Sequence, residues 1–358
     1  MPKQKTLRLI LGDQLNELHS WFQKPDKNVS FVLMEIRQET DYVAHHIQKA
    51  AAFFAAMRAF AKRLRGLGHQ VIYLKLDDRQ NHQTIAGNIG ELLKGKKFNR
   101  FEYLQPDEFR LDLQLRELSE SLPVPCEMLD SEHFLTGRME LEDFFFGKKR
   151  YLMESFYRWM RKRYDILMDG KKPVGDQWNF DQKNRHPYDG KVPVPEPLLF
   201  ENNVSAICKT IRNEKVATIG EIKADRLIWP VSRDQALKLL KSFVTHFLPA
   251  FGTYEDAMVA NNWHLFHSRL SFSLNTKMLH PREVIEAAVE AWKKKSGDIG
   301  IHQIEGFVRQ ILGWREYMRG IYWTLMPDLE AMNFFDQKAA LPKFYWTGET
   351  RMNCLRCA

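Results

Sequence analysis

The first 135 residues alternate between short apolar segments and segments with helical periodicity, and this order restricts the possible folds more than any other feature. Five apolar segments have the length of strands: TLRLILGDQL, VSFVLMEI, QVIYLKL, RFEYLQP and PCEMLD. Strands that alternate with helices form parallel sheets, because a parallel pair needs a long crossover connection. We therefore expect an α/β domain with a doubly wound parallel sheet over residues 1–135.

The carboxyl ends of these strands are the expected place for a ligand, as in other open parallel sheets. No G-x-G-x-x-G motif is present, so a classical dinucleotide site is not predicted. His45 and His46 open a long helical segment and are expected to be capping or surface residues. The polar and glycine residues expected at the strand ends are Gly12, Asp13, Gln14, Glu35, Glu39 and Tyr42.

The rest of the chain changes character twice. Residues 136–201 are basic and aromatic at first and then rich in Pro, Gly and Asn, which is typical of a helix followed by a connecting segment. From residue 202 onward the strand signals vanish, and segments such as PREVIEAAVEAWKKK have helical spacing. We therefore expect an all-helical domain over residues 202–358.

Charge and composition narrow the class of protein. The 358 residues carry a formal net charge of +8, which suits a polyanionic partner without requiring one. Four cysteines in this length do not make a secreted disulfide scaffold. No signal peptide is evident, and no apolar run approaches the roughly 18 residues that span a bilayer. These features predict a cytoplasmic protein without membrane spans.

Residues 148–164, KKRYLMESFYRWMRKRY, interleave cations with aromatic rings. Such a pattern suits nucleic acid, with Arg161 and Arg163 meeting phosphates while rings stack on bases. It also suits a solvated helix face whose rings lie in the core, and sequence alone favours this second interpretation.

Two further segments could hold a ligand. In YEDAMVANNWHLFHSRLSFSLN, hydroxyls, an arginine and helix-start amides could bind a pyrophosphate, or Ser268 and Ser271 could simply cap a helix. In QILGWREYMRGIYW, two arginines and Glu316 stand among aromatic rings, which implies a buried polar network or a ligand. Both alternatives stay open at each segment.

The last residues, RMNCLRCA, place Cys354 and Cys357 in a C-x-x-C arrangement. Such a pair usually indicates a metal, a cluster or a redox dithiol, and a four-iron cluster commonly needs four thiolates. Cys126 and Cys208 are isolated in the sequence and are expected to be buried thiols.

Several motifs, in one order along the whole chain, resemble a known family. TYEDAM, FHSRLSFSLN, PREVIEAA, GWREYMRGIYW and FYWTGETRMNCLR resemble the iron–sulfur branch of the photolyase/cryptochrome family. Its members are called bacterial cryptochromes, prokaryotic (6-4) photolyases or deoxyribodipyrimidine photolyase-related proteins. LGDQL, MEIRQETDYVAHH and MDGKKPVGDQWNFDQKNR resemble the same branch.

The resemblance implies an α/β domain that holds the antenna 6,7-dimethyl-8-ribityllumazine and a helical domain that holds FAD and a four-iron four-sulfur cluster. It implies blue-light-driven electron transfer from reduced FAD to pyrimidine (6-4) lesions in UV-damaged DNA. The lesion would be flipped out of the base stack to reach the flavin. It also implies a monomer. A cryptochrome-like photoreceptor without repair is the alternative.

The resemblance assigns roles residue by residue. Tyr254 resembles the tyrosine that packs on FAD, and Trp314 and Arg315 resemble the pair beside flavin and lesion. Trp346 resembles an electron-transfer tryptophan, and Glu39 and Tyr42 resemble antenna contacts. The turn that resembles the family's FAD phosphate-binding segment comprises His267, Ser268, Leu270 and Ser271.

Cys354 resembles the first cluster ligand, whereas Cys357 matches no ligand position. Family members continue well past MNCLR, so the resemblance implies a C-terminally truncated chain with an incomplete FAD-binding domain. We therefore expect that this chain holds no stoichiometric cluster, binds FAD weakly and does not repair DNA. A further alternative is that the chain is a non-catalytic remnant. The antenna, in contrast, is expected to bind to residues 1–135 alone.

Overall fold

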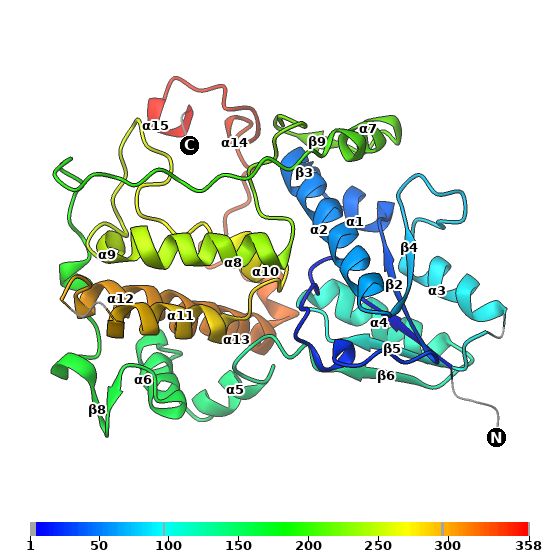
Figure 1. The fold of residues 1–358 in the computed structure, drawn as a ribbon, viewed down its shortest axis with the longest axis horizontal. Helices are drawn as coiled ribbons and strands as arrows, with labels where there is room; N and C mark the ends of the chain where they lie inside the picture. Colours follow the sequence, from blue (N-terminus) through cyan, green and yellow to red (C-terminus); the bar gives the residue numbers. More distant parts are fainter. Residues whose placement is uncertain (1–4, 96, 295–296, 357–358) are drawn as a thin grey trace.

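The computed structural model describes residues 5–95, 97–294 and 297–356, and it divides into an α/β part and a helical part that lie side by side (Figure 1). The N-terminal third forms the α/β part. Helices dominate the rest, as expected. Among the described residues, no helix is both long and apolar enough to cross a membrane.

A five-stranded parallel sheet with the order β4-β2-β1-β5-β6 forms the centre of the α/β part and confirms the predicted fold class. In register, Leu9 of β1 stands beside Val32 of β2 and Tyr103 of β5. The order runs outward from β1 in both directions, which makes the sheet doubly wound. The strands are β1 (Thr6–Leu9), β2 (Val29–Met34), β4 (Gln70–Leu74), β5 (Arg100–Leu104) and β6 (Cys126–Leu129).

Helices cover both faces of this sheet, because its central strands are apolar on both sides. Phe31 and Leu33 of β2 join the hydrophobic cluster that contains α2 (Ile47–Gly66). Val32 and Met34, which alternate with them, join the cluster of α3 (Ile85–Lys94) and α4 (Phe109–Ser121). The α2 cluster continues into the core of the helical part, so the two parts share buried apolar surface.

The segment between β2 and α2 departs from the expectation that His45 and His46 open the long helix. A short helix, α1 (Arg37–Asp41), comes first, and α2 begins only at Ile47. His46 caps α2, because its imidazole accepts a hydrogen bond from the Gln48 amide at 3.1 Å, as predicted for a capping residue. His45 and His46 also form β3, which pairs with β9 (Thr218–Ile219).

The connecting region contains helices and two very short strands. These are α5 (Glu140–Phe145), α6 (Met153–Tyr164), β7 (Met168–Asp169) and β8 (Lys172–Pro173). The region after residue 202 is helical apart from β9. Its helices are α7 (Ser205–Asn213), α8 (Arg233–Ser242), α9 (Leu248–Phe251), α10 (Ser271–Asn275), α11 (Pro281–Lys294), α12 (Ile301–Val308), α13 (Glu316–Leu325), α14 (Phe344–Thr347) and α15 (Asn353–Arg356), with π-helical turns at Phe243–Phe247 and Arg309–Arg315.

Candidate functional site

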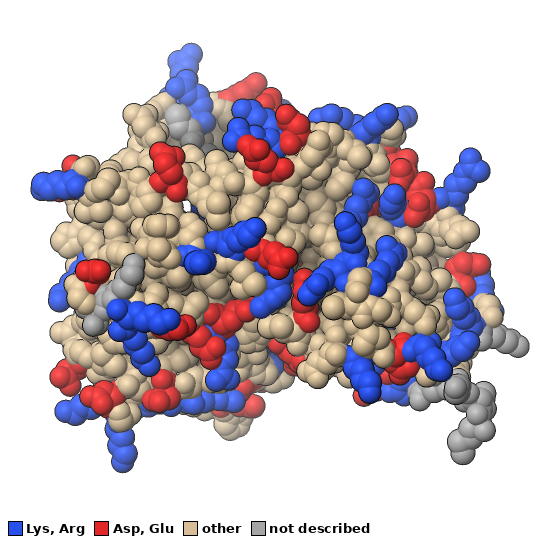
Figure 2. All heavy atoms as spheres, in the orientation of Figure 1, with Lys and Arg blue, Asp and Glu red and all other residues tan. Residues whose placement is uncertain are grey.

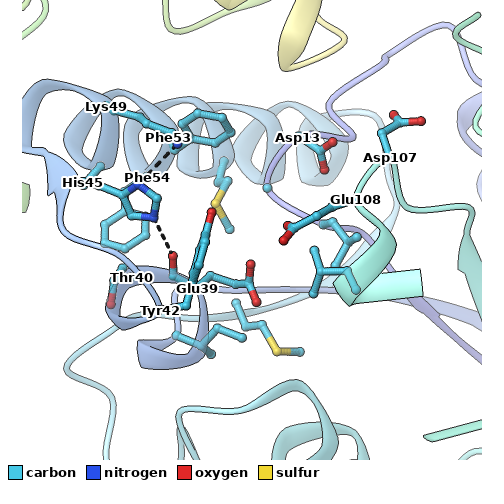
Figure 3. Close-up of a pocket in the computed structure, with 17 residues that line it drawn as sticks. Asp13, Glu39, Thr40, Tyr42, His45, Lys49, Phe53, Phe54, Asp107 and Glu108 are labelled. Atoms are coloured by element: carbon cyan, nitrogen blue, oxygen red, sulfur yellow. Dashed lines mark hydrogen bonds between the residues drawn. The ribbon is translucent and has the colours of Figure 1, made fainter. Parts of the chain in front are cut away.

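A cavity of about 280 Å³ lies at the carboxyl ends of the strands, where the sequence predicted a ligand. We call it the sheet-end cavity, and Figure 3 shows its lining. Glu39 and Tyr42 line it, together with Gly12 and Asp13 from the end of β1. Its apolar wall comprises Leu11, Met34, Ile36, Ala50, Phe53, Phe54, Met57 and Leu111, and its remaining polar lining comprises Thr40, His45, Lys49, Asp107 and Glu108.

Arg110 holds one side of this cavity together. Its guanidinium donates to both carboxylate oxygens of Glu39, at 3.1 and 2.9 Å, and to those of Glu108, at 2.7 and 3.0 Å. It also lies over the Tyr42 ring, 4.3 Å from the ring centroid. Burial tends to lower the pKa of Arg110, but the two carboxylates outweigh it and raise the pKa, so the clamp stays charged.

On the opposite side, His45 and Lys49 form a short polar chain. The His45 Nε2 atom lies 3.2 Å from the Glu39 carbonyl oxygen, and the Lys49 ammonium donates to Nδ1 at 3.3 Å (Figure 3). Burial and the nearby Lys49 charge lower the pKa of His45, which favours a neutral imidazole. Burial and Glu108 raise the pKa of Tyr42, so its phenol stays protonated. On this side the cavity therefore offers a neutral imidazole and a protonated phenol beside the Lys49 ammonium group, above an apolar floor.

Two residues predicted at the strand ends serve the fold rather than this cavity. Gln14 donates to the carbonyl oxygens of Leu104 and Gln105, at 3.3 and 3.1 Å, and ties β1 to β5. Glu35 is fully buried and accepts from Arg58 at 2.6 and 2.8 Å and from the Tyr73 hydroxyl at 2.6 Å. Neither residue lines the sheet-end cavity.

A larger hollow of about 940 Å³ lies between the α/β part and the helices, and we call it the interdomain hollow. Three residues assigned by the resemblance line it: Ser271 at the start of α10, Trp314 and Arg315. Trp314 leaves 41% of its surface exposed, so its ring is available to a ligand. The other lining residues are Asp13, Lys49, Phe53, Asp107, Phe134, Phe272, Leu274, Asn275, Lys277, Met318, Arg319 and Tyr322.

Arg315 lies in this hollow without a carboxylate partner among the described residues. It donates to Asn275 Oδ1 at 3.1 Å and to the Leu274 carbonyl at 3.2 Å, and it lies 3.0 Å from the Nε2 atom of buried His133. Burial lowers the pKa of Arg315, and burial also lowers the pKa of His133 well below its usual range. His133 is thus a neutral acceptor, and the Arg315 charge could pair with an anion.

Glu316, next to Arg315, belongs to a buried polar network, which is one of the two interpretations that the sequence left open. Its carboxylate accepts from the Leu135 and Thr136 amides at 3.1 Å each and from the Thr136 hydroxyl at 2.7 Å. Burial raises the pKa of Glu316, while these donors and Arg319 act against the rise. The contact ties α13 to the segment that follows β6.

The other predicted FAD contacts lie outside the lining of the interdomain hollow. Tyr254 is 9% exposed, and its ring is stacked on Phe266 with centroids 5.2 Å apart. The His267 ring faces Phe251 edge-on, with centroids 6.4 Å apart. Leu270 is buried, and its amide donates to Ser268 Oγ at 3.5 Å, which closes the turn locally. Leu270 is the N-cap residue of α10 and no side chain caps this helix, so the expected capping by Ser268 or Ser271 is wrong.

The C-terminal candidates lie apart from both cavities. Trp346 on α14 is 72% exposed, and Cys354 on α15 is exposed. Cys208 is buried in α7, as expected, but Cys126 in β6 is only partly buried. Cys357 lies outside the described residues. Within the described ranges no group of three or more His, Cys, Asp or Glu residues could hold a metal ion.

The basic-aromatic segment 148–164 has most of its rings wholly or partly buried and most of its cations exposed, while Tyr151 is 37% exposed. Phe156 and Tyr157 are fully buried, whereas Arg158 and Lys162 are exposed. The prediction that Arg161 meets phosphates is wrong, because its side chain is fully buried and donates to the carbonyls of residues 166, 167 and 178. On the face of the molecule that Figure 2 shows, Lys and Arg side chains are spread over both the α/β part and the helical part, with acidic side chains between them.

Sequence reasoning missed Arg110, Asp107 and Lys277. Asp107 and Glu108 lie three and four residues after the end of β5, so the rule that named Asp13 after β1 could have found them. Arg110 follows two residues later, and no local signal shows that its partner is Glu39. Lys277 reaches the α/β part from the loop after α10, which no sequence pattern indicates.

Comparisons with known proteins agree with this architecture. Residues 8–227 match the model of the family described as deoxyribodipyrimidine photo-lyase-related protein. A (6-4) photolyase of Agrobacterium fabrum is 36% identical over 356 residues, covering 98% of this chain and 69% of that protein. The uncharacterized protein R852 of Acanthamoeba polyphaga mimivirus is 25% identical over 198 residues, covering 52% of this chain and 97% of that protein.

A solved structure shares the fold. The bacterial class III photolyase from Agrobacterium tumefaciens superposes with a TM-score of 0.58 at 15% identity, covering 97% of this chain and 65% of that one. The chain thus spans about two thirds of the length of these photolyases. The family model matches more than half of the chain, and the chain is 36% identical to a (6-4) photolyase over 98% of its length. The chain therefore belongs to the deoxyribodipyrimidine photo-lyase-related protein family.

Proposed function

We propose that this chain belongs to a photolyase-like flavoprotein for blue-light-driven repair of UV-damaged DNA, with (6-4) lesions as the substrate. Its own contribution is a chromophore site in the sheet-end cavity, and the chromophore is 6,7-dimethyl-8-ribityllumazine. The observation that carries this proposal is the cavity with Glu39 and Tyr42 in its lining. The 36% identity to a (6-4) photolyase supports the activity.

The donor set of the cavity suits a flat, polar heteroaromatic ring with a polyhydroxylated chain. The apolar floor, including Phe53, matches the faces of a bicyclic ring. Carboxylates of Glu39 and Asp13 can accept hydrogen bonds from ribityl hydroxyls, and Lys49 can donate to ring carbonyls. Enclosure by α2 and the strand ends would exclude water from the ring and keep it fixed relative to the helical part.

FAD is proposed for the interdomain hollow. Arg315 offers a guanidinium with no carboxylate partner among the described residues, which suits a phosphate, and Trp314 offers an exposed ring. FAD, when bound and reduced, supplies the electron for lesion cleavage. Tyr254, His267, Ser268 and Leu270 contribute to the proposal only as supports of the turn that positions Ser271.

An iron–sulfur cluster does not fit the described residues. Cys126, Cys208 and Cys354 stand on three separate elements, and no ligand group for a metal is found within the described ranges. We therefore derive no step through a cluster and assign no electron-transfer role to Trp346, which is exposed on α14.

A titration of the purified chain with 6,7-dimethyl-8-ribityllumazine tests the proposal. We expect saturable binding with one ligand per chain and loss of binding in Ala50→Trp, because Ala50 is buried in the cavity wall and an indole would fill the space. Ala288→Trp is the control for overpacking, since Ala288 is also buried, at 0% exposure against 7% for Ala50, but lies on α11, outside the cavity. Absence of binding by the wild-type chain would refute the chromophore site.

Repair is tested separately. The chain reconstituted with FAD is assayed for cleavage of a synthetic (6-4) lesion in DNA under blue light, and cleavage would overturn the expectation that this chain does not repair. Binding of both chromophores without repair would instead favour a cryptochrome-like photoreceptor.

A further inference from the structure

The sheet-end cavity and the interdomain hollow share one wall. Asp13, Lys49, Phe53 and Asp107 line both. Asp13 follows β1 and Asp107 follows β5, and these strands are neighbours in the sheet. The two carboxylates therefore belong to one edge of the sheet, and any change in their positions alters both spaces.

Lys277 from the helical part reaches these two carboxylates. Its ammonium group lies 2.8 Å from Asp13 Oδ2, 2.9 Å from the Asp13 carbonyl and 2.7 Å from Asp107 Oδ2. Only 3% of its side chain is exposed. Burial tends to lower the pKa of Lys277, but Asp107 and Asp13 outweigh it and raise the pKa, so the group is an ammonium cation.

The wall depends on this cation, because two carboxylates near each other repel. Burial tends to raise the pKa of Asp107, but Lys277, with Arg319 and Arg138 behind it, outweighs burial and lowers the pKa. Asp13 has no other cation within 4.0 Å in the described ranges, and 32% of its side chain is exposed, so it is free to turn away once Lys277 is lost.

The backbone at Lys277 supports a specific role. Its φ angle is +62°, in the left-handed region that non-glycine residues rarely adopt and that costs roughly 1 kcal/mol or more. The neighbouring Thr276 carbonyl accepts from the Leu15 amide at 2.9 Å, which fixes the loop against the α/β part. The loop thus holds a strained residue in a fixed place, with its side chain directed at the wall.

We propose that Lys277 is a positioning residue for the chromophore site, which the helical part thereby completes from outside the α/β domain. It acts by holding Asp13 and Asp107 in the orientation that shapes the sheet-end cavity. This inference rests on the proposed binding of the lumazine there. It also replaces the expectation that residues 1–135 are sufficient for full affinity.

The test compares the full chain with its Lys277→Met and Lys277→Arg variants. The dissociation constant and the bound absorption maximum of 6,7-dimethyl-8-ribityllumazine are measured for each. We expect Lys277→Met to weaken binding about tenfold, the size of one charge-assisted contact, and to shift the maximum. Lys277→Arg should restore both to near the wild-type values, because a guanidinium can still bridge the two carboxylates.

Arg309→Met is the matched control for lost stability. Arg309 is a buried cation of the helical part whose Nη2 lies 3.1 Å from Glu305, and it lines neither cavity. Its loss should leave the affinity and the absorption maximum unchanged. If Lys277→Met fails to fold, Lys277→Gln takes its place with the same expected direction, because its amide still donates to one carboxylate.

Combining Lys277→Met with Asp13→Asn shows whether Lys277 acts through Asp13. The double variant should bind no more weakly than Lys277→Met alone, because the asparagine amide oxygen still accepts a hydrogen bond from the ligand while removal of the Asp13 charge relieves the repulsion that the lost cation exposes. Fully additive losses, or unchanged binding in Lys277→Met and Lys277→Gln, would overturn the inference. A wild-type chain that does not bind the lumazine would refute the proposed chromophore site itself.

Discussion

Replacing Arg110 with methionine should weaken binding of 6,7-dimethyl-8-ribityllumazine about thirtyfold. Arg110 does not line the sheet-end cavity but holds Glu39 in a two-point ion pair and lies 4.3 Å from the Tyr42 ring centroid. Without it, Glu39 and Glu108 face each other as like charges, and Tyr42, which is 52% exposed, loses its contact. The ligand would then have to order these side chains itself.

The magnitude follows from that ordering. Immobilising one flexible side chain on binding costs about 0.5–1.5 kcal/mol. Two side chains, Glu39 and Tyr42, together cost about 2 kcal/mol, which is about thirtyfold in the dissociation constant. Arg110→Lys should recover only part of this loss, because an ammonium group cannot pair with both carboxylates through a planar fork.

Fluorescence titration of the lumazine with the purified variants measures the effect. Arg116→Met is the matched control: Arg116 is on the same helix and pairs with Asp112 at 2.9 Å, but it lies outside the cavity. The affinity of the Arg116→Met variant for the lumazine should stay within about twofold of the wild-type value, because surface ion pairs contribute little to stability. Equal affinities for Arg110→Met and the wild-type chain would refute the clamp.

Three further predictions concern stability and DNA. Burial and the Asp256 charge raise the pKa of Glu255 to about 7, so the contribution of Glu255 to the free energy of unfolding is full at low pH and is lost as the pH rises through 7. In urea unfolding, the free energy of unfolding should therefore fall by about 1–2 kcal/mol from pH 5 to pH 8, and Glu255→Gln should remove most of this fall. Equal pH dependence in the wild-type chain and the variant would contradict the prediction. Arg161→Met should cost about 2–3 kcal/mol of unfolding free energy, since it leaves one buried and two partly buried carbonyl oxygens without their donor; a loss under about 1 kcal/mol would contradict it. Arg158→Ala with Lys162→Ala should lower the salt slope of DNA binding by up to ~2 if this exposed face meets phosphates, and an unchanged slope would identify a solvated face.

Most of the architecture was predictable because its signals are local. The five strands are runs of apolar residues such as Phe31–Val32–Leu33, and the parallel order follows from the helices between them. The position of a site at the strand ends follows from the same topology, and Glu39 and Tyr42 line the cavity there, where the sequence placed them. Helix α2 was less predictable at its start, since β3 and its cap replace the expected first turn.

The contacts that complete the site could not be predicted, because they join residues far apart in the sequence. Arg110 meets Glu39 across 71 positions, and Lys277 meets Asp13 across 264. Arg161 shows the opposite failure: its charge and aromatic neighbours suggested DNA, but its helical position turns it to the core beside Tyr157. Which face of α6 is buried depends on the π-helical segment packed on it, and a local pattern does not contain that information.

A crystal structure of the chain grown with 6,7-dimethyl-8-ribityllumazine tests the proposed chromophore site most directly. We predict electron density for the bicyclic ring in the sheet-end cavity, between Tyr42 and Phe53, with Asp13 and Glu39 within hydrogen-bond distance of the ligand. Density for the ring in the interdomain hollow, or an empty sheet-end cavity at saturating ligand, would contradict it.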